Sequence, residues 1–280
     1  MPRLETIIEK GDFKTLLSLV EEDKSVIGKP VSDSTPDQPL HLAVWQNRMK
    51  VALFLIEQGA DVNTIGDLGK TPLHYASING CLKLAKVLLE HGANPNIRTT
   101  YNHTPMLSAA RTGDPKSMKI ARLLLESGAE ADLNSLVSLG ETQRVCALLS
   151  QDKNNLWQAV DPFSLLDDAV IMVAYQIMVR KQYEPSPEQD AIVREYEPMF
   201  LCLLDAGADI NAIASTGVPP LYSAVSTNIP ALVRFLLEKG ADVNYQYHTG
   251  SAVIDLISVS QGSRKNQVRQ IMEDFRNKKK

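Results

Sequence analysis

The chain has 280 residues, of which 44% are hydrophobic and 22% charged, and its formal net charge is −4. This length exceeds what one hydrophobic core usually organises, so we expect either two domains or a linear array of repeats. The weak net charge disfavours a dedicated nucleic-acid binder, which usually carries a strongly basic face. The longest apolar stretch, 169–179, is too short to span a bilayer, and the N-terminus does not resemble a signal peptide. We therefore expect a cytoplasmic protein that binds neither nucleic acid nor membrane.

The first predicted element is a helix pair over residues 4–20 that turns at Gly11 and Asp12. This pair lacks the Thr-Pro motif (the Thr-Pro word below) with which later helix pairs begin, as at Thr71 and Pro72. The terminal units of a repeat array need a polar outer face, because only internal units bury both flanks. We therefore assign residues 1–33 to an N-terminal cap.

Three regular helix pairs follow within residues 34–132, at about 34–66, 67–99 and 100–132. Gly-Ala-Asp-Val-Asn at 59–63 and Gly-Ala-Asn-Pro-Asn at 92–96 are 33 residues apart. A second word precedes each of them, Pro-Leu-His-Leu-Ala at 39–43 and Thr-Pro-Leu-His-Tyr-Ala at 71–76. Two different words that share one period indicate a repeat array.

Each word has a local physical reason. Thr71 is a suitable N-cap for a helix, and Pro72 then occupies the first helical position, where its missing N–H has no cost. Gly80 ends this first helix, since glycine tolerates the left-handed conformation that closes many helices. A second helix over about 82–90 has helical apolar spacing and ends in the same way at Gly92.

Residues 133–214 form a divergent middle with an insertion. A helix pair over 133–150 has no finger loop after it, and a long apolar helix follows at about 164–180. The Glu-Pro-Ser-Pro segment at 184–187 breaks this helix, because proline disfavours helical conformation around it, and a second helix begins near Asp190.

The pattern becomes regular again over residues 215–247, where Pro219 and Pro220 replace the Thr-Pro word. The last segment, 248–280, ends in a polar run. We assign this segment to a C-terminal cap, for the same reason as the first one.

With these words on a 33-residue period, the sequence resembles the ankyrin-repeat family. The resemblance implies an all-α solenoid of about eight helix pairs with short hairpin-like fingers, irregular in the middle. We interpret residues 1–280 as a single ankyrin-repeat domain. The middle either continues the stack or kinks it, and we favour a continuous array.

His41 and His74 stand in the Pro-Leu-His words. The resemblance to the ankyrin family implies that this histidine has a structural role and joins the capping turn to the adjacent repeat. The two histidines are one repeat apart and do not converge on one ion, and buried polar groups usually satisfy hydrogen bonds. We predict no metal and no cofactor.

The sequence contains no phosphate-binding loop, no nucleophile elbow and no zinc-binding helix motif. Asp167 and Asp168 form a tight carboxylate pair, but adjacent helical positions do not face each other. We expect them on a solvated edge or bonded to the preceding turn. We predict that the chain is not an enzyme; the alternative is an enzyme or regulatory subunit with a site in the 150–200 segment.

The cysteines Cys81, Cys146 and Cys202 are widely spaced and form no Cys-x-x-Cys pair. This pattern predicts reduced thiols in a reducing compartment, without a disulfide or a zinc site. Cys146 and Cys202 lie in apolar helical segments, so we expect them to pack in the core. Cys81 stands near a helix start, where a thiol pKa can fall, and we expect an unreactive surface thiol.

Asn63, Asn211 and Asn244 each end a Gly-Ala-Asp-x-Asn word. This arrangement is similar to the pattern that is hydroxylated in some eukaryotic ankyrin proteins. Asparagine is also a common turn residue, and we expect that structural role here.

The ankyrin resemblance further implies a concave face of finger tips and first helices, with variable residues at fixed positions around the Thr-Pro word. The candidate partner-binding residues at these positions are Trp45, Gln46, Leu68, Lys70, Ile78, Tyr101, His103 and Arg111. Aromatic and arginine side chains dominate interface energetics. The alternative is that Trp45 and Ile78 pack against neighbouring first helices. We therefore predict a monomeric protein–protein interaction module, an adaptor or inhibitor whose partner is another protein.

Overall fold

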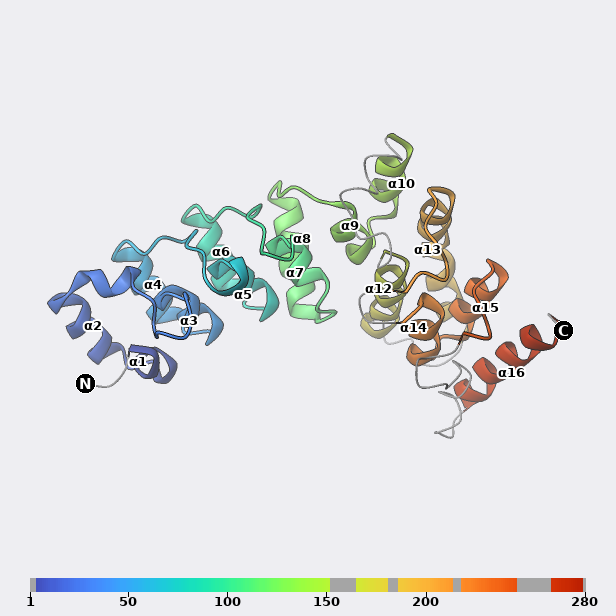
Figure 1. Ribbon diagram of the computed structural model, residues 1–280, viewed down its shortest axis with the longest axis horizontal. Helices are drawn as coiled ribbons and strands as arrows, with labels where there is room; N and C mark the ends of the chain where they lie inside the picture. Colours follow the sequence, from blue (N-terminus) through green and yellow to red (C-terminus); the bar gives the residue numbers. More distant parts are fainter. Residues whose placement is uncertain (1–3, 152–164, 181–185, 214–217, 246–262, 279–280) are drawn as a thin grey trace. The chain divides into compact units, whose positions relative to one another are not determined.

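The computed structural model describes residues 4–151, 165–180, 186–213, 218–245 and 263–278 (Figure 1). In this part of the chain the regular structure is helical, with no β-strand beyond one isolated bridge between Ser32 and Thr35. The chain forms two compact units, Met1–Ala131 and Asp132–Lys280. Each unit is described by itself below.

The described part of the first unit consists of four helix pairs. These are α1 (Leu4–Lys10) with α2 (Phe13–Glu22), α3 (Pro39–Trp45) with α4 (Met49–Glu57), α5 (Pro72–Ile78) with α6 (Leu82–Glu90), and α7 (Pro105–Ala110) with α8 (Pro115–Glu126). Short 3-10 helices lie at Lys24–Gly28 and Asp67–Gly69. The first helices α1, α3, α5 and α7 pack side by side in chain order, and α4, α6 and α8 pack behind them (Figure 1).

The capping predictions for the third pair are confirmed. Thr71 is the N-cap of α5, Pro72 is its first residue, and the Thr71 side chain forms a capping box with His74. Gly80 has a φ of 65°, the left-handed conformation that glycine adopts without strain. Leu73 and its neighbours on the same helix face are fully buried, which stabilises the stack by roughly 2 kcal/mol for each leucine.

The fingers between repeats are tight hairpin-like loops, as expected. The backbone N–H of Gly66 donates to the carbonyl of Lys70 at 2.8 Å, and that of Thr99 donates to His103 at 2.9 Å. Thr100 also donates its backbone N–H to the carbonyl of Leu68 at 3.0 Å, so successive fingers are bonded to each other. The fingers therefore hold adjacent repeats in register.

Asparagine side chains add a second connection between repeats at the other end of the helix pairs. Asn63 accepts a hydrogen bond from the backbone N–H of Asn94 at 2.7 Å and donates one to the carbonyl of Gly92 at 3.0 Å. Asn211 accepts from the backbone N–H of Asp242 at 2.8 Å. The expected structural role of these asparagines is confirmed at both positions.

The described part of the second unit continues the pattern of paired helices. Its helices are α9 (Leu133–Leu139), α10 (Thr142–Gln151), α12 (Leu165–Val179), α13 (Pro187–Asp205), α14 (Pro220–Thr227), α15 (Pro230–Glu238) and α16 (Ser263–Lys278). Helices α9, α12 and α14 pack consecutively, as do α10, α13 and α15, and α16 packs on α15. The divergent middle of the sequence is therefore also built from stacked helix pairs.

The break predicted at 184–187 ends at the start of α13, where Ser186 is the N-cap and Pro187 the first helical residue. The rest of this break, at 184–185, lies outside the described residues. The assignment of all 280 residues to one domain stays a prediction, since the two units are each compact on their own.

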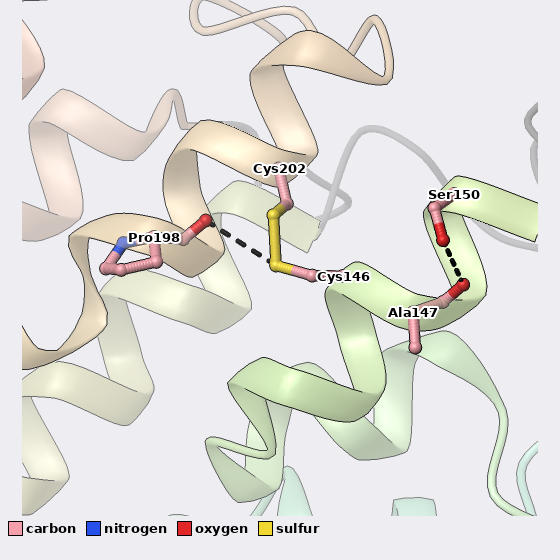
Figure 2. The surroundings of a disulfide bond; sticks show 5 residues. All are labelled: Cys146, Ala147, Ser150, Pro198 and Cys202. Atoms are coloured by element: carbon pink, nitrogen blue, oxygen red, sulfur yellow. Dashed lines mark hydrogen bonds between the residues drawn. A yellow bond between two sulfur atoms is a disulfide. The ribbon is translucent and has the colours of Figure 1, made fainter.

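Cys146 of α10 and Cys202 of α13 form a disulfide, with their Cα atoms 5.6 Å apart (Figure 2). The expectation of reduced thiols without a disulfide is therefore wrong for this pair. Both residues are half-buried, so the expected core packing is also wrong. The physical reason is that α10 and α13 are neighbouring second helices, which brings together two cysteines that are 56 residues apart. The inference of a reducing compartment loses its basis.

Cys81 is the N-cap of α6 and is 8% exposed, so the expected surface thiol is wrong as well. Burial raises the pKa of its thiol, which outweighs the influence of Lys116. A raised pKa leaves the group protonated and unreactive at neutral pH. The expected lack of reactivity is thus in agreement with the structure, although its cause is burial.

Candidate partner-binding surface

Trp45, the last residue of α3, packs on the neighbouring first helix and also faces solvent. Its ring lies edge-on to Tyr75 of α5, with ring centroids 5.4 Å apart. The Asn79 side-chain amide donates to the Trp45 carbonyl at 2.9 Å, which fixes the end of α3. The indole nevertheless remains 47% exposed. Trp45 therefore packs against the neighbouring first helix and still presents a large apolar surface to solvent.

Tyr75 is the centre of a small polar and aromatic cluster. Its hydroxyl donates to Asp37 Oδ2 at 2.9 Å, and Asp37 Oδ1 accepts the backbone N–H of Asp67 at 2.8 Å. Lys70 Nζ lies 5.6 Å from the centre of the Tyr75 ring, a cation–π contact. Burial, followed by the charge of Asp37, raises the pKa of Tyr75, so the phenol stays neutral. The cluster locks the finger of one repeat to the first helix of the next.

Next to this cluster, fingers and first helices enclose an open pocket of about 220 Å³. Its lining residues are Lys70, Ile78, Thr99, Tyr101, His103, Ser108, Arg111 and Thr112. Five of the eight candidate residues from the sequence thus meet in one pocket. Tyr101 is 66% exposed, and Arg111 Nη1 donates to His103 Nε2 at 3.2 Å. Lysine and arginine supply positive charge, and the pocket lining contains no carboxylate side chain.

The other three candidates lie outside this lining. Trp45 and Leu68 are exposed, whereas Gln46 is the half-buried C-cap of α3. Leu68 occupies a finger tip and has a φ of 54°, a conformation that is unfavourable for a branched side chain. Its carbonyl accepts hydrogen bonds from both the backbone N–H and the hydroxyl of Thr100. The neighbouring finger therefore helps to hold Leu68 in this strained position.

The sequence did not indicate a role for Tyr75, whose hydroxyl Asp37 anchors. Tyr75 occupies the variable position of the Thr-Pro-Leu-His-x-Ala word. Its signal in the sequence is its size, since an aromatic ring at this helix position must contact the neighbouring repeat. Its role here is to position Trp45 and Lys70.

The structural role predicted for the histidines is confirmed. His41 Nδ1 accepts the backbone N–H of Gln38 at 3.0 Å, and its Nε2 faces the carbonyls of Thr64 and Lys70 at 3.0 and 3.2 Å. His74 repeats this arrangement, accepting from Thr71 and donating to the carbonyl of His103. Because Nδ1 accepts an N–H in each case, Nε2 carries the proton.

Burial stabilises the neutral form of both imidazoles. It lowers the pKa of His41 and lowers that of His74 to about 4, because a buried imidazolium would lose hydration. Both rings are fully buried. They are therefore fixed linkers between repeats and are poorly suited to transfer protons near neutral pH.

The carboxylate pair of α12 lies in the interior of its unit. Asp167 and Asp168 are buried in α12, so the expected solvated edge is wrong. In the described parts of the chain, no group of three or more histidine, cysteine or acidic residues has the geometry to hold a metal ion. No described helix is long and apolar enough to cross a membrane.

A larger open hollow of about 900 Å³ lies along the loop 29–36. It is lined mainly by small and polar loop residues, and its lysine, Lys29, is paired with Asp23 at 3.1 Å. It lacks the aromatic and arginine side chains that dominate protein interfaces. The smaller pocket between the fingers is therefore the better candidate for partner recognition.

Stacked helix pairs, capping histidines and hydrogen-bonded fingers define a helical repeat protein. The family model for ankyrin repeats (3 copies) matches residues 40–135, and the model for a single ankyrin repeat matches 216–247. These matches identify ankyrin repeats at residues 40–135 and 216–247 and support an ankyrin-repeat protein. Ankyrin repeats are generally protein–protein interaction modules, and their domains are typically non-enzymatic.

Individual relatives are distant. An ankyrin repeat protein of Borreliella burgdorferi is 28% identical over 97 residues, which cover 35% of this chain and 44% of that protein. The match thus spans less than half of that relative. The crystal structure of the human ASB11 ankyrin repeat domain is 24% identical, covers 85% of this chain and 98% of that one, and has a TM-score of 0.45.

Proposed function

We propose that this protein is an adaptor or inhibitor that binds a partner protein through the strip formed by its second to fourth repeats. The strip consists of Trp45, Gln46, Leu68, Lys70, Ile78, Tyr101, His103 and Arg111, on the first helices and fingers of the first unit. The adaptor and the inhibitor differ in whether the covered surface of the partner includes its active site.

One observation carries the proposal: three large apolar side chains are exposed together on the strip. Trp45, Leu68 and Tyr101 are 47%, 41% and 66% exposed. Large apolar side chains exposed on one face of a soluble domain commonly mark interaction sites. Lys70 and Arg111 stand among them, and arginine and large aromatic residues are enriched in binding hot spots.

The backbone of the finger supports the same conclusion. The left-handed conformation of Leu68 costs on the order of 1–2 kcal/mol, and the finger hydrogen bonds from Thr100 offset this cost. Folding would not select an exposed leucine in a strained conformation for stability alone. A contact with a partner gives this side chain a role.

The proposal is tested by quantitative affinity capture from the lysate of the native organism. Trp45→Ala/Tyr101→Ala removes the two exposed rings, and Lys83→Ala/Lys86→Ala on the exposed side of α6 is the matched control. Loss of a hot spot of about 2 kcal/mol corresponds to a roughly 30-fold weaker complex. We expect specific partners to be lost with the ring variant and kept with the control. Equal capture by all three proteins would overturn the assignment.

An enzymatic site in the 150–200 segment was the alternative function. Residues 152–164 and 181–185 lie outside the described residues, and the described remainder contains no group of three or more histidine, cysteine or acidic residues that could hold a metal ion. No observation therefore favours this alternative. The monomeric state and the cytoplasmic location stay predictions, which sedimentation velocity and cell fractionation test.

A further inference from the structure

Helix α10 of the second unit is held on its neighbours by few buried side chains. Of its ten residues, Val145 and Leu149 are buried, whereas α13 buries seven residues and α15 buries six. A helix shorter than about 12–15 residues is marginal in water on its own, so α10 depends on its tertiary contacts. Two apolar side chains offset a small part of the conformational entropy that ten ordered residues lose.

The side chains of α10 add no polar connection to α13 apart from Cys146. Arg144 is paired with Glu141, one turn away in the sequence, at 3.9 Å. The Ser150 hydroxyl donates to the carbonyl of Ala147 at 2.7 Å, within the same helix (Figure 2). Within the described part of the chain, the disulfide is therefore the strongest link between α10 and α13.

The turn before α10 is fixed independently of the disulfide. Gly140 has a φ of 76°, and a Cβ atom at this position would come within 3.0 Å of Met172 in α12 and 3.2 Å of Tyr196 in α13. The backbone N–H groups of Gly140 and Glu141 donate to carbonyls of α9 at 3.0 and 2.9 Å. This closely packed turn retains the chain at one end when the helix that follows it detaches.

The disulfide lies where a reductant can reach it. Cys146 and Cys202 are half-buried, and Gln143 and Ser150, one turn to either side of Cys146, are exposed. The third cysteine, Cys81, is buried in the first unit and does not compete for the bond. Attack on a disulfide requires access to one of its sulfur atoms, and this position provides it.

After reduction, a single weak hydrogen bond is available to replace the covalent bond. The sulfur of Cys146 lies 3.7 Å from the carbonyl oxygen of Pro198 (Figure 2). A thiol at this position can donate to that oxygen, but S–H groups are weak donors. Reduced α10 therefore depends on its two buried side chains, Val145 and Leu149.

We propose that the Cys146–Cys202 bond is a redox-sensitive switch, whose reduction releases α10 from α13 while the other helices of the second unit stay folded. A dithiol supplies the two electrons. Its first thiolate attacks one sulfur to form a mixed disulfide and displaces the other cysteine, and its second thiolate then closes a ring disulfide and displaces the first. Each cysteine takes up one of the two protons that the dithiol loses. A small disulfide such as oxidised glutathione reverses the reaction.

Hydrogen exchange of the full chain, measured by mass spectrometry before and after treatment with dithiothreitol, tests the proposal. We expect the amides of α10 to exchange roughly 30-fold faster or more in the reduced protein. The amides of α15, a second helix without cysteine, should be nearly unchanged. Reoxidation with oxidised glutathione should restore slow exchange in α10. Alkylation with iodoacetamide, followed by mass measurement, establishes that the bond is open or closed in each sample.

Cys146→Ser/Cys202→Ser is the matched variant. It should show fast exchange in α10 with or without dithiothreitol, and circular dichroism establishes that it is folded. Unchanged exchange of α10 in the reduced wild-type protein would overturn the proposal, because the buried side chains would then suffice. Equal acceleration of α10 and α15 would also overturn it, since reduction would then loosen the whole unit. Failure of dithiothreitol to reduce the bond in the folded protein would have the same consequence.

Discussion

The Nε2 atom of His74 lies 3.0 Å from the carbonyl oxygen of His103, so an imidazole of one repeat is bonded to the finger that leads into the next. The same ring accepts the backbone N–H of Thr71 at its other nitrogen. The bond at Nδ1 therefore requires the neutral imidazole, whose Nε2–H donates to the carbonyl. Protonation would remove the acceptor and place a charge in the core.

This relationship predicts that stability falls in mild acid. The pKa of His74 is lowered from 6.5 to about 4, so between these values the unfolded chain binds a proton that the folded chain excludes. The stability that depends on neutral His74 is therefore fully present above the pKa of the unfolded state, 6.5. It decreases as the pH falls towards 4. The expected contribution of His74 is a loss of about 2 kcal/mol between pH 7 and pH 5. His41, whose pKa is also lowered, acts in the same direction.

Urea unfolding at several pH values measures this effect. His74→Gln is the comparison, because a glutamine at this position of the helix can still reach the N-cap backbone. It should be less stable at pH 7 but lose less stability on acidification. An identical pH dependence in both proteins would contradict the assigned role of His74.

Tyr75→Phe should lower the free energy of unfolding by about 1–2 kcal/mol, because it removes a hydrogen bond from a buried phenol to the carboxylate of Asp37. Tyr101→Phe removes the same atom from an exposed ring and should change stability by less than about 0.5 kcal/mol. Chemical denaturation of the two variants distinguishes them. Equal effects would mean that the Tyr75 hydroxyl does not anchor the cluster.

The disulfide predicts one titratable thiol in the unfolded, unreduced protein, that of Cys81. A thiol count of three would contradict the pairing of Cys146 with Cys202. Reduction should destabilise the second unit by roughly 2–4 kcal/mol, since the bond constrains a long loop in the unfolded chain. Cys146→Ser/Cys202→Ser should lose the same stability and become insensitive to reductant, and this can be measured by thermal denaturation with and without a dithiol.

Asn63→Ala should destabilise the first unit by about 1–2 kcal/mol, because it removes two hydrogen bonds to the following repeat. Asn94→Ala provides the control, since the Asn94 side chain accepts a local hydrogen bond, from the backbone N–H of Asn96. Its effect should be smaller. Hydrogen exchange of the amides around 92–96 should accelerate in Asn63→Ala more than in Asn94→Ala.

Much of the first unit was predictable because its signals are local. A Thr-Pro word, a glycine with positive φ and apolar positions at helical spacing each determine one turn or one helix, as at Thr71, Gly80 and 82–90. Five of the predicted strip residues also meet in one pocket, because a repeat brings equivalent positions together on one face. The repeat period therefore also predicted which residues lie close together in the folded chain.

The predictions that are wrong concern contacts between residues that the repeat period does not relate to each other. The Cys146–Cys202 bond depends on the packing of α10 on α13, and no local pattern links the two cysteines. Cys81 is covered by its surroundings although it stands at a helix start, and Asp167 is buried although it has an acidic side chain. In each case burial is decided by residues that are distant in the sequence.

The central claim is that partners bind on the strip, and site-specific photo-crosslinking in the native organism tests it most directly. A benzophenone amino acid replaces Tyr101 on the strip in one variant, and Lys86 on the exposed side of the second helix α6 in another. We expect a discrete crosslinked partner from position 101 that position 86 does not give. The same partner captured from position 86, with none captured from position 101, would contradict it.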